Sequence, residues 1–283
     1  MTGTLYLCAT PIGNLKDITE RVRETLGNVD LIAAEDTRNS MKLMTHFDIH
    51  VPMTSYHEYN KFDKADDIVN TLISGKDVAL ITDAGTPAVS DPGEVLVRKC
   101  IDAGIPVTSL PGPSAVITAL TLSGLSTGRF SFEGFLSREK KERKRILSEL
   151  KEEMRTIILY ESPHHLPGTL KDLYEVLGDR KIALCRELTK KHEEIIRISL
   201  GEAMSYYEVN APRGEFVLVI EGKSREEIDE EKYRSFDELS VAEHVEMYEK
   251  QGLDRKEAMK AAAKDRGVQK RDIYQALLDS EGR

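Results

Sequence analysis

The chain has 283 residues, which exceeds the size at which a single hydrophobic core usually stops growing, so we expect more than one domain. Its 40% hydrophobic and 31% charged residues are typical of a soluble globular protein, and no apolar run is long enough to span a bilayer. The net charge of −9 argues mildly against a general nucleic-acid-binding protein. The three cysteines stand far apart in apolar contexts, and the seven histidines lack metal-ligand spacing. We therefore expect reduced thiols, a cytoplasmic protein and no metal.

Short apolar runs alternate with amphipathic segments in the first part of the chain. Buried strands are predicted at 4–10, 31–36, 78–83 and 106–112. Helices are predicted between them at 19–26, 39–47, 65–74 and 92–103. This alternation predicts a largely parallel sheet with helices on both faces, and we assign residues 1–112 to this first α/β domain.

A second α/β domain is predicted for residues 113–222. A helix is expected to begin after Ser114, which has the side chain of a helix cap. Strands are predicted at 155–162, 181–188, 194–200 and 215–222, and helices at 165–177 and 201–207. The short connection between 188 and 194 favours an antiparallel pair within this domain.

The last part of the chain changes in character. Residues 223–239 are charged and poor in apolar side chains, which predicts a linker, and residues 240–283 carry helical patterns. Ser240 begins a capping box, Asp254 repeats the device, and Gly267 stands where a helix should stop. We expect a small helical module that is similar to a helix-turn-helix.

Four polar loops follow the predicted strands, where α/β proteins build ligand sites. They lie at 9–17, 34–40, 81–96 and 109–120. The first lacks the GxGxxG spacing of a dinucleotide cradle. The third combines two glycines, two prolines and two aspartates, so it should be rigid and offer fixed backbone groups to a polar ligand. The second, third and fourth loops, each taken alone, are also compatible with a helix cap, an elaborate turn or a capped helix start.

Taken together, the segments LYLxATPIGNLxDIT, AEDTR, ITDAGTPxxSDPG, LPGPSA and CRELTK resemble the tetrapyrrole methylase superfamily over residues 3–222. Within it they are most similar to the branch that 2′-O-methylates a cytidine in the decoding region of small-subunit ribosomal RNA. The resemblance implies two α/β domains, S-adenosylmethionine in the cleft between them, a homodimer, and an RNA acceptor in the small ribosomal subunit. By motif position it implies cofactor contacts from Pro11, Ile12, Asp83, Gly85, Thr86, Ser114, Ala115, Tyr160 and Leu188.

A ribose hydroxyl is a weak nucleophile, so its methylation should need a positioned base as well as alignment of the donor and acceptor. The candidates are Glu35 and Asp36, then His57 and Glu58, and then Glu187. We prefer Asp36, because the AEDTR segment follows a strand and should face the cleft. The alternatives are a helix-capping role for Asp36 and an ordinary surface position for His57.

Basic side chains provide candidate RNA contacts. Arg38, near the expected active site, and Lys190 could bind phosphates that flank the acceptor. Two basic clusters, at 138–145 and 255–271, could bind a folded RNA or a ribonucleoprotein, and the alternative for both is a solvated helix face. From these clusters we select Arg143, Lys144, Lys256 and Lys260.

Two other functions are compatible with the same segments. One is a related methyltransferase that acts on a porphyrinoid carbon or on a protein. The other is a non-catalytic ribosome-assembly factor that keeps the fold, which would bind RNA without transferring a methyl group.

Overall fold

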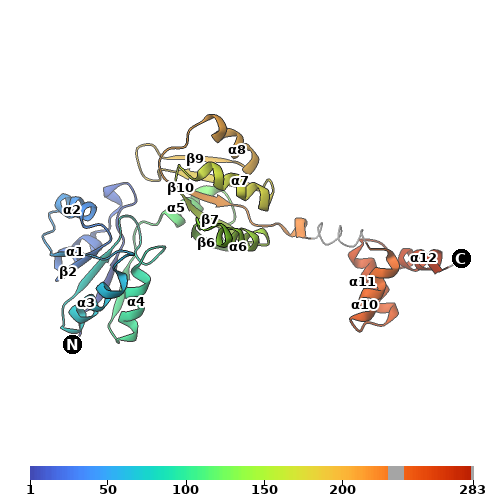
Figure 1. Cartoon of the computed structure of the whole chain (residues 1–283), viewed down its shortest axis with the longest axis horizontal. Coiled ribbons are helices and arrows are strands. Elements are labelled where there is room, and N and C mark those ends of the chain that lie inside the picture. The colour runs from blue at the N-terminus through green and yellow to red at the C-terminus, as the bar shows by residue number, and fades with distance from the viewer. Residues whose placement is uncertain (229–238, 282–283) are drawn as a thin grey trace. The chain divides into compact units, whose positions relative to one another are not determined.

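The computed structural model describes residues 1–228 and 239–281, which form two compact units. The first unit consists of residues 1–151 and 155–221, and the second of residues 152–154 and the described residues from 222 onward. Figure 1 shows two sheets with helices packed against them in the first unit and a cluster of helices in the second. Within the described part of the chain, no helix is both long and apolar enough to cross a membrane.

The first sheet has five strands in the order β3-β2-β4-β1-β5, and every neighbouring pair is parallel. Its strands are β1 (Leu5–Cys8), β2 (Leu31–Ala34), β3 (Met53–Ser55), β4 (Val78–Ile81) and β5 (Val107–Leu110). The helices that follow them are α1 (Glu20–Asn28), α2 (Thr37–His46), α3 (Lys61–Ile73) and α4 (Gly93–Asp102), and a short 3-10 helix, η1 (Leu15–Asp17), precedes α1. The predicted parallel sheet is confirmed.

Alternate side chains of the first sheet are buried on opposite faces, as the two-residue period of a strand requires. Leu7 and Leu80 pack in the core formed with α3 and α4, whereas Cys8 and Ile81 pack in the core formed with α1 and α2. Because helices cover both faces, polar ligands can reach this sheet only at the ends of its strands.

The second sheet has the order β6-β7-β10-β8-β9, with β6 and β7 parallel and the other neighbouring pairs antiparallel. Its strands are β6 (Phe130–Phe135), β7 (Thr156–Glu161), β8 (Lys181–Arg186), β9 (Glu194–Ser199) and β10 (Phe216–Ile220). Helix α5 (Ala115–Ser123) packs against one face, and α6 (Lys140–Lys151), α7 (Leu166–Leu177) and α8 (Leu200–Val209) pack against the other. The predicted antiparallel pair is confirmed as β8 and β9.

The directions of these strands bring three chain segments to one edge. Phe216, the first residue of β10, is paired with Glu161 at the end of β7 and with Arg186 at the end of β8. The ends of two strands and the start of a third therefore meet at the same edge of the second sheet.

The second unit contains α10 (Val241–Lys250), α11 (Arg255–Asp265) and α12 (Lys270–Glu281) around a small apolar core. The capping box at Ser240 is formed, Asp254 accepts the backbone N–H of Glu257, and Gly267 has the positive φ of 63° that is typical of a helix stop. The predicted helical module is confirmed.

The first residues of the predicted linker form a helical turn. Ser224 and Glu227 make reciprocal capping hydrogen bonds of 2.7 and 3.0 Å at a helical turn over 225–228. The remainder of the predicted linker, at 229–238, lies outside the described residues.

The cysteines behave as expected from their apolar contexts. Cys8, Cys100 and Cys185 are buried free thiols. Burial raises the pKa of Cys8 to about 12 and that of the other two to about 11, so all three remain protonated and unreactive at neutral pH.

Candidate active site

Three loops at the carboxyl edge of the first sheet are joined to one another by hydrogen bonds to backbone carbonyl groups. Thr10, after β1, and Gly85, after β4, exchange two N–H···O bonds of 2.9 and 3.0 Å. The hydroxyl of Thr86 donates to the carbonyl of Pro113, after β5, over 3.1 Å. Three loops that are far apart in sequence therefore form one continuous surface.

The loop between β4 and α4 is held in an unusual conformation by one carboxylate. Asp91 accepts the backbone N–H groups of Ala88, Val89 and Gly93 over 3.0, 3.3 and 2.7 Å. Ala88 and Ser90 have positive φ values of 65° and 66°, which cost on the order of 1–3 kcal/mol each for residues other than glycine. Such strain is often found at ligand sites. The loop is therefore both a turn capped by Asp91 and a rigid surface, so the two interpretations considered for this segment hold together.

A cavity of ≈ 350 Å³ lies between this surface and the strand-end edge of the second sheet. Most of the cofactor residues implied by the resemblance line it: Ile12, Gly85, Thr86, Ser114, Ala115, Tyr160 and Leu188. Glu35, Glu187 and Lys190 also line it. Ser114 precedes α5 as expected, but its side chain makes no capping hydrogen bond.

Two implied cofactor residues lie elsewhere. Pro11 and Asp83 line a separate groove at the same edge of the first sheet, on the side of α2. Asp36, Arg38 and His57 line neither cavity.

Adjacent carboxylates after β2 have different roles. Asp36 is the N-cap of α2, and hydrogen bonds from the side chain and backbone of Arg38 lower its pKa to about 2. Glu35 lines the cavity, and its pKa is raised, first by burial and then by the nearby charges of Asp83 and Asp91, although the backbone N–H of Asp83 opposes the shift. These contacts argue against our preference for Asp36 as the base and favour Glu35.

The loop after β8 brings three charged groups together. The Lys190 ammonium lies 2.9 Å from Glu187 and 2.8 Å from Glu215. Partial burial is the largest influence on Glu187 and acts to raise its pKa, but hydrogen bonds from Lys190 and the backbone of Glu215 together hold the pKa below its usual value. Lys190 is therefore committed to ordering this loop and is not the free phosphate-binding charge that we expected, and Glu187 is a weaker base than an ordinary glutamate.

The loops of the two sheets touch at a glycine in the loop after β1. A Cβ on Gly13 would lie 2.4 Å from Cγ of Lys190 and 2.9 Å from the carbonyl oxygen of Leu188. Glu187 and Thr189, on either side of Leu188, have positive φ values of 51° and 65°. The loop after β8 is therefore strained and is packed directly against the loop after β1.

The comparisons with known proteins agree with this geometry. Residues 4–204 match the family model described as Tetrapyrrole (Corrin/Porphyrin) Methylases. This chain is a member of the tetrapyrrole methylase family. A relative from Bacillus subtilis (strain 168), named ribosomal RNA small subunit methyltransferase I, is 50% identical over 274 residues, which are 97% of this chain and 94% of the relative. A protein of the same name from Thermotoga maritima is 46% identical over 221 residues, which are 78% of this chain and 99% of that relative.

Solved structures share the fold at low sequence identity. Uroporphyrin-III-C-methyltransferase from Thermus thermophilus has a TM-score of 0.55 and 17% identity, covering 77% of this chain and 94% of that chain. Diphthine synthase has a TM-score of 0.60 and 13% identity, covering 77% and 90%. The tetrapyrrole methylase fold predicted from the sequence is thus confirmed.

Membership of this methyltransferase family makes S-adenosylmethionine the cofactor, and the cavity fits it. Its volume lies within the range of about 300–1,000 Å³ that is usual for small-molecule sites. Gly85 has a φ of 82°, and a Cβ there would lie 3.3 Å from Ile12, so glycine lets the backbone form the cavity wall. Carboxylates outnumber cations in the lining, which suits a cationic sulfonium. They are Glu35, Asp91, Glu161, Glu187 and Glu215, against Lys190.

Sequence reasoning missed several lining residues of this methylase site. They are Phe135, Glu161, Ser162, Cys185, Glu215, Phe216 and Val217. Glu161 and Ser162 directly follow Tyr160, so the end of the predicted strand 155–162 could have indicated them. Glu215 and Phe216 stand at the start of β10, and only the antiparallel direction of that strand brings them to the site.

The aromatic segment after β3 has mixed roles. Tyr56 belongs to the core, and its hydroxyl donates to the carbonyl of Pro92 over 2.9 Å. Tyr59 is 97% exposed, and its ring lies 6.1 Å from that of His57. Within residues 1–228 and 239–281, the buried Nδ1 of His57 has no hydrogen-bond partner. His57 is therefore outside the cavity and partly buried, which gives it no direct contact with the site.

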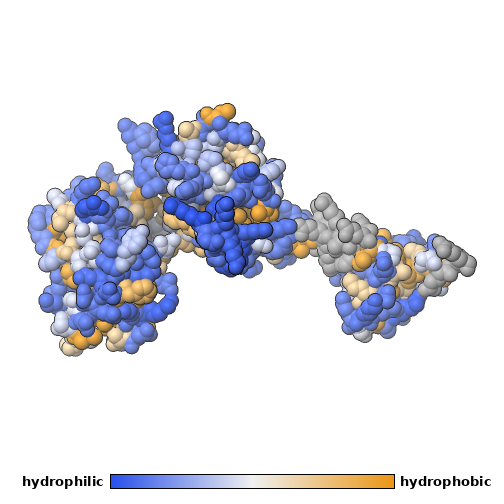
Figure 2. Space-filling model, viewed as in Figure 1, coloured by the Kyte–Doolittle hydropathy of each residue, from blue (hydrophilic) through white to orange (hydrophobic). Residues whose placement is uncertain are grey.

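Helix α6 carries the first basic cluster, where Figure 2 shows hydrophilic side chains gathered. The Arg143 guanidinium lies 2.6 Å from the Asp172 carboxylate and also donates to the Thr169 hydroxyl over 2.9 Å. The Thr169 hydroxyl in turn donates to the carboxylate of Glu161, which lines the cavity, over 2.5 Å. Arg143 is therefore a structural residue, and our expectation that it binds RNA is not supported, because its guanidinium is occupied. Lys144 is exposed on the same helix.

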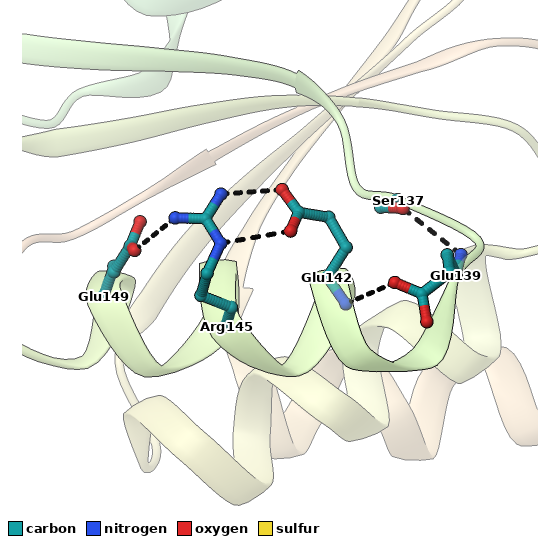
Figure 3. A network of polar contacts seen from close by, with 5 residues as sticks. All are labelled: Ser137, Glu139, Glu142, Arg145 and Glu149. Carbon is teal, nitrogen blue, oxygen red and sulfur yellow. Dashed lines mark hydrogen bonds and ion pairs between the residues drawn. The ribbon is translucent and has the colours of Figure 1, made fainter.

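Other charges of α6 neutralise one another, as Figure 3 shows. Arg145 bridges Glu142 and Glu149 over 2.6 and 2.5 Å, and Glu139 accepts the backbone N–H of Glu142 over 2.7 Å at the start of the helix. The solvated helix face that we considered as an alternative describes this part of the cluster. In the second unit, Lys256 and Lys260 are exposed on α11.

Proposed function

We propose that this methyltransferase methylates the ribose 2′-hydroxyl of a cytidine in the decoding region of small-subunit ribosomal RNA. The observation that carries the proposal is the similarity to relatives named ribosomal RNA small subunit methyltransferase I, which extends over 97% of the chain and includes every loop of the cavity. The 2′-oxygen and the cytidine follow from the resemblance of the motifs.

The reaction requires alignment and removal of a proton. S-adenosylmethionine supplies an electrophilic methyl carbon when bound. The hydrogen-bonded loops around Thr10, Gly85 and Thr86 would hold their backbone groups in fixed positions, so little reorganisation is needed during the reaction.

Glu35 is the base in this proposal. Its carboxylate lines the cavity, and a pKa raised by burial makes it a stronger proton acceptor than an ordinary glutamate. Lys190 would keep Glu187 ionised and fixed, which leaves Glu187 to shape the acidic wall rather than to accept the proton. Each residue then has one role: Glu35 accepts the proton, and Glu187 contributes charge.

The acceptor is proposed to be the RNA within an assembled or assembling small subunit, and the enzyme is proposed to act as a cytoplasmic homodimer. Exposed lysines such as Lys144, Lys256 and Lys260 are available for contacts with phosphates on such a large particle. Sedimentation of the purified protein measures the dimer directly, and a single monomeric boundary at working concentration would exclude it.

The proposed reaction is tested by incorporation of tritiated methyl groups. The purified enzyme is given labelled S-adenosylmethionine with small subunits from cells that lack the protein, and separately with a porphyrinoid. Mass spectrometry of the digested RNA is expected to find the methyl group on the ribose of one cytidine. Label on a base, on ribosomal protein or on the porphyrinoid would overturn the proposal. RNA binding without any transfer would support the assembly-factor alternative.

A further inference from the structure

A second groove of ≈ 350 Å³ lies at the same edge of the first sheet as the cofactor cavity. The loop after β1, the end of β4 and one face of α2 form its walls. Its lining includes Pro11, Leu15, Asn39, Lys42, His46 and Asp83. The cavity assigned to S-adenosylmethionine leaves these side chains without a role.

One short segment separates the groove from the cofactor cavity. Thr82 lines both, Asp83 lines only the groove, and Ala84 lines only the cavity. The backbone N–H of Asp83 lies 3.5 Å from Oε2 of Glu35, which faces the cavity. A nucleotide in the groove would therefore lie next to the proposed catalytic base, Glu35, and its ribose would have to reach past Thr82, which lines both sites, to meet the methyl group.

The polar groups at the end of the groove form a donor and acceptor pair. The amide of Asn39 donates to Oδ2 of Asp83 over 3.4 Å, a long bond that a ligand can replace. In the described part of the chain, Oδ1 of Asp83 has no hydrogen-bond partner. An amino group that donates to this carboxylate, with a neighbouring acceptor facing Asn39, would complement the pair.

Helix α2 presents a basic edge to the groove. Asn39, Lys42 and His46 are spaced by three and four residues, which places them along one side of the helix. Lys42 is exposed and has no ion pair within residues 1–228 and 239–281, unlike Arg38, which is paired with Asp36. The free charge of Lys42 and the N–H of His46 suit phosphate oxygens.

We propose that this groove binds the acceptor nucleotide, with its base against Asp83 and Asn39 and its flanking phosphates against Lys42 and His46. The inference rests on the proposed function, and it adds a means by which the enzyme selects the nucleobase of the acceptor. Cytosine offers an amino group to Asp83 and a ring nitrogen acceptor to Asn39, whereas uracil would direct a carbonyl oxygen at the carboxylate. Unpaired RNA bases are commonly recognised in this way, at edges that are free of pairing.

The groove is tested in the full-length enzyme with undermethylated small subunits that carry either cytidine or uridine at the modified position. Asp83→Asn is expected to reduce the cytidine-over-uridine preference in kcat/KM by about tenfold, within the range for a base contact. Lys42→Gln is expected to reduce the slope of log kcat/KM against log salt by about 0.7, the value for one phosphate contact to single-stranded RNA. Both variants should bind S-adenosylmethionine in calorimetry with unchanged affinity.

A matched control is Lys76→Gln, because Lys76 is an exposed lysine just before β4, at the opposite end of the same sheet. Its salt slope and base preference should equal those of the wild type. If Lys42→Gln behaves like this control and Asp83→Asn keeps the wild-type preference, the groove does not bind the nucleotide. If instead the wild type transfers no methyl group to small subunits, the proposed function itself has failed.

Discussion

The two sheets of the first unit contribute to the same cavity in different ways. In the first sheet all strands are parallel, so every loop after a strand emerges at one edge, and the loops after β1, β4 and β5 are joined by hydrogen bonds to backbone groups. In the second sheet the strands run in both directions, and the site receives the ends of β7 and β8 with the start of β10. There the order comes from charged side chains, Lys190 with Glu187 and Glu215.

This difference indicates which substitutions each side tolerates. The loops of the first sheet form the cavity wall with backbone atoms, so a substitution that adds atoms there should damage the site more than one that removes a side chain. A surface ordered by ion pairs depends on charge, so its response should follow pH. We expect the first sheet's side of the cavity to align the substrates and accept the proton, and the second sheet's side to close the cavity.

The largest expected effect is that of Glu35→Gln, which tests whether the first sheet supplies the base. Methyl transfer in a single turnover should fall by about 100-fold or more, since general base catalysis typically contributes 10²–10⁴. Binding of S-adenosylmethionine, measured by calorimetry, should fall much less than the rate, because four of the five lining carboxylates remain. Because the ionised carboxylate is the active form and its pKa is raised, the wild-type rate should rise with pH through a value above the ordinary 4.5.

Asp36→Asn is the control for this experiment, because the neighbouring carboxylate caps α2 instead of facing the cavity. It should retain most of the rate, and since Asn also caps helices well, the urea midpoint of unfolding should change little. A rate that falls more in Asp36→Asn than in Glu35→Gln would restore Asp36 as the base.

The next effect tests the contact between the two sides. In Gly13→Ala the new Cβ would meet a backbone carbonyl at 2.9 Å and the Lys190 side chain at 2.4 Å, so the loops must move apart. We expect affinity for S-adenosylmethionine to fall by about tenfold or more, with destabilisation of about 1–3 kcal/mol from overpacking. Gly27→Ala is the control: Gly27 lies in α1 with no atom within 4 Å of its added Cβ, and alanine should stabilise that helix by up to about 1 kcal/mol. Equal affinities in the two variants would show that the contact is unimportant.

A smaller effect should follow from the buried support behind the second sheet. Arg143→Leu removes the group that joins Asp172 and Thr169, and through Thr169 it loosens Glu161 in the cavity wall. Stability in urea should fall by about 2 kcal/mol, the range for hydrogen bonds to charged groups. Lys144→Gln, one residue along α6 and exposed, should change stability by less than about 0.5 kcal/mol. If the two variants were equally stable, Arg143 would be a surface residue after all.

The sequence predicted most of the fold because buried strands and amphipathic helices leave strong local patterns. It missed β3, which has three half-buried residues, and β6, whose exposed residues break the apolar run. Both strands lie at sheet edges, where burial on a single side weakens the pattern.

The site was predicted less completely, for reasons that can be traced to single residues. We predicted α2 to begin at Asn39, but it begins at Thr37, which makes Asp36 the cap and leaves Glu35 to face the cavity. Arg143 finds its partner 29 residues away, a distance at which one sequence shows no pairing. Predicting that Glu215 lies at the site requires the direction of β10 in the sheet, and hydrophobic periodicity does not give the direction of a strand.

The smallest effect in this series is that of Lys190→Gln, and it should depend on pH. Glu187 has a lowered pKa, so its contribution to stability is present above the ordinary glutamate pKa of 4.5 and is lost as pH falls through the lower folded value. Lys190 has a raised pKa despite the opposing effect of burial, so its contribution is present below its unfolded pKa of about 10.4 and is lost at higher pH. The pair therefore stabilises the fold between these two limits.

At pH 7 we expect Lys190→Gln to lower the free energy of unfolding by only about 1 kcal/mol, because the Lys190 side chain is 32% exposed and that of Glu215 is 82% exposed. The difference should shrink as the pH falls below about 4.5, since carboxyls that become protonated no longer attract the ammonium. Urea unfolding of both proteins at pH 7 and at a series of lower pH values measures this change. A loss that stays the same at every pH would mean that Lys190 acts by packing its alkyl chain against Gly13, and the loop after β8 would then be ordered by shape, as the loops of the first sheet are.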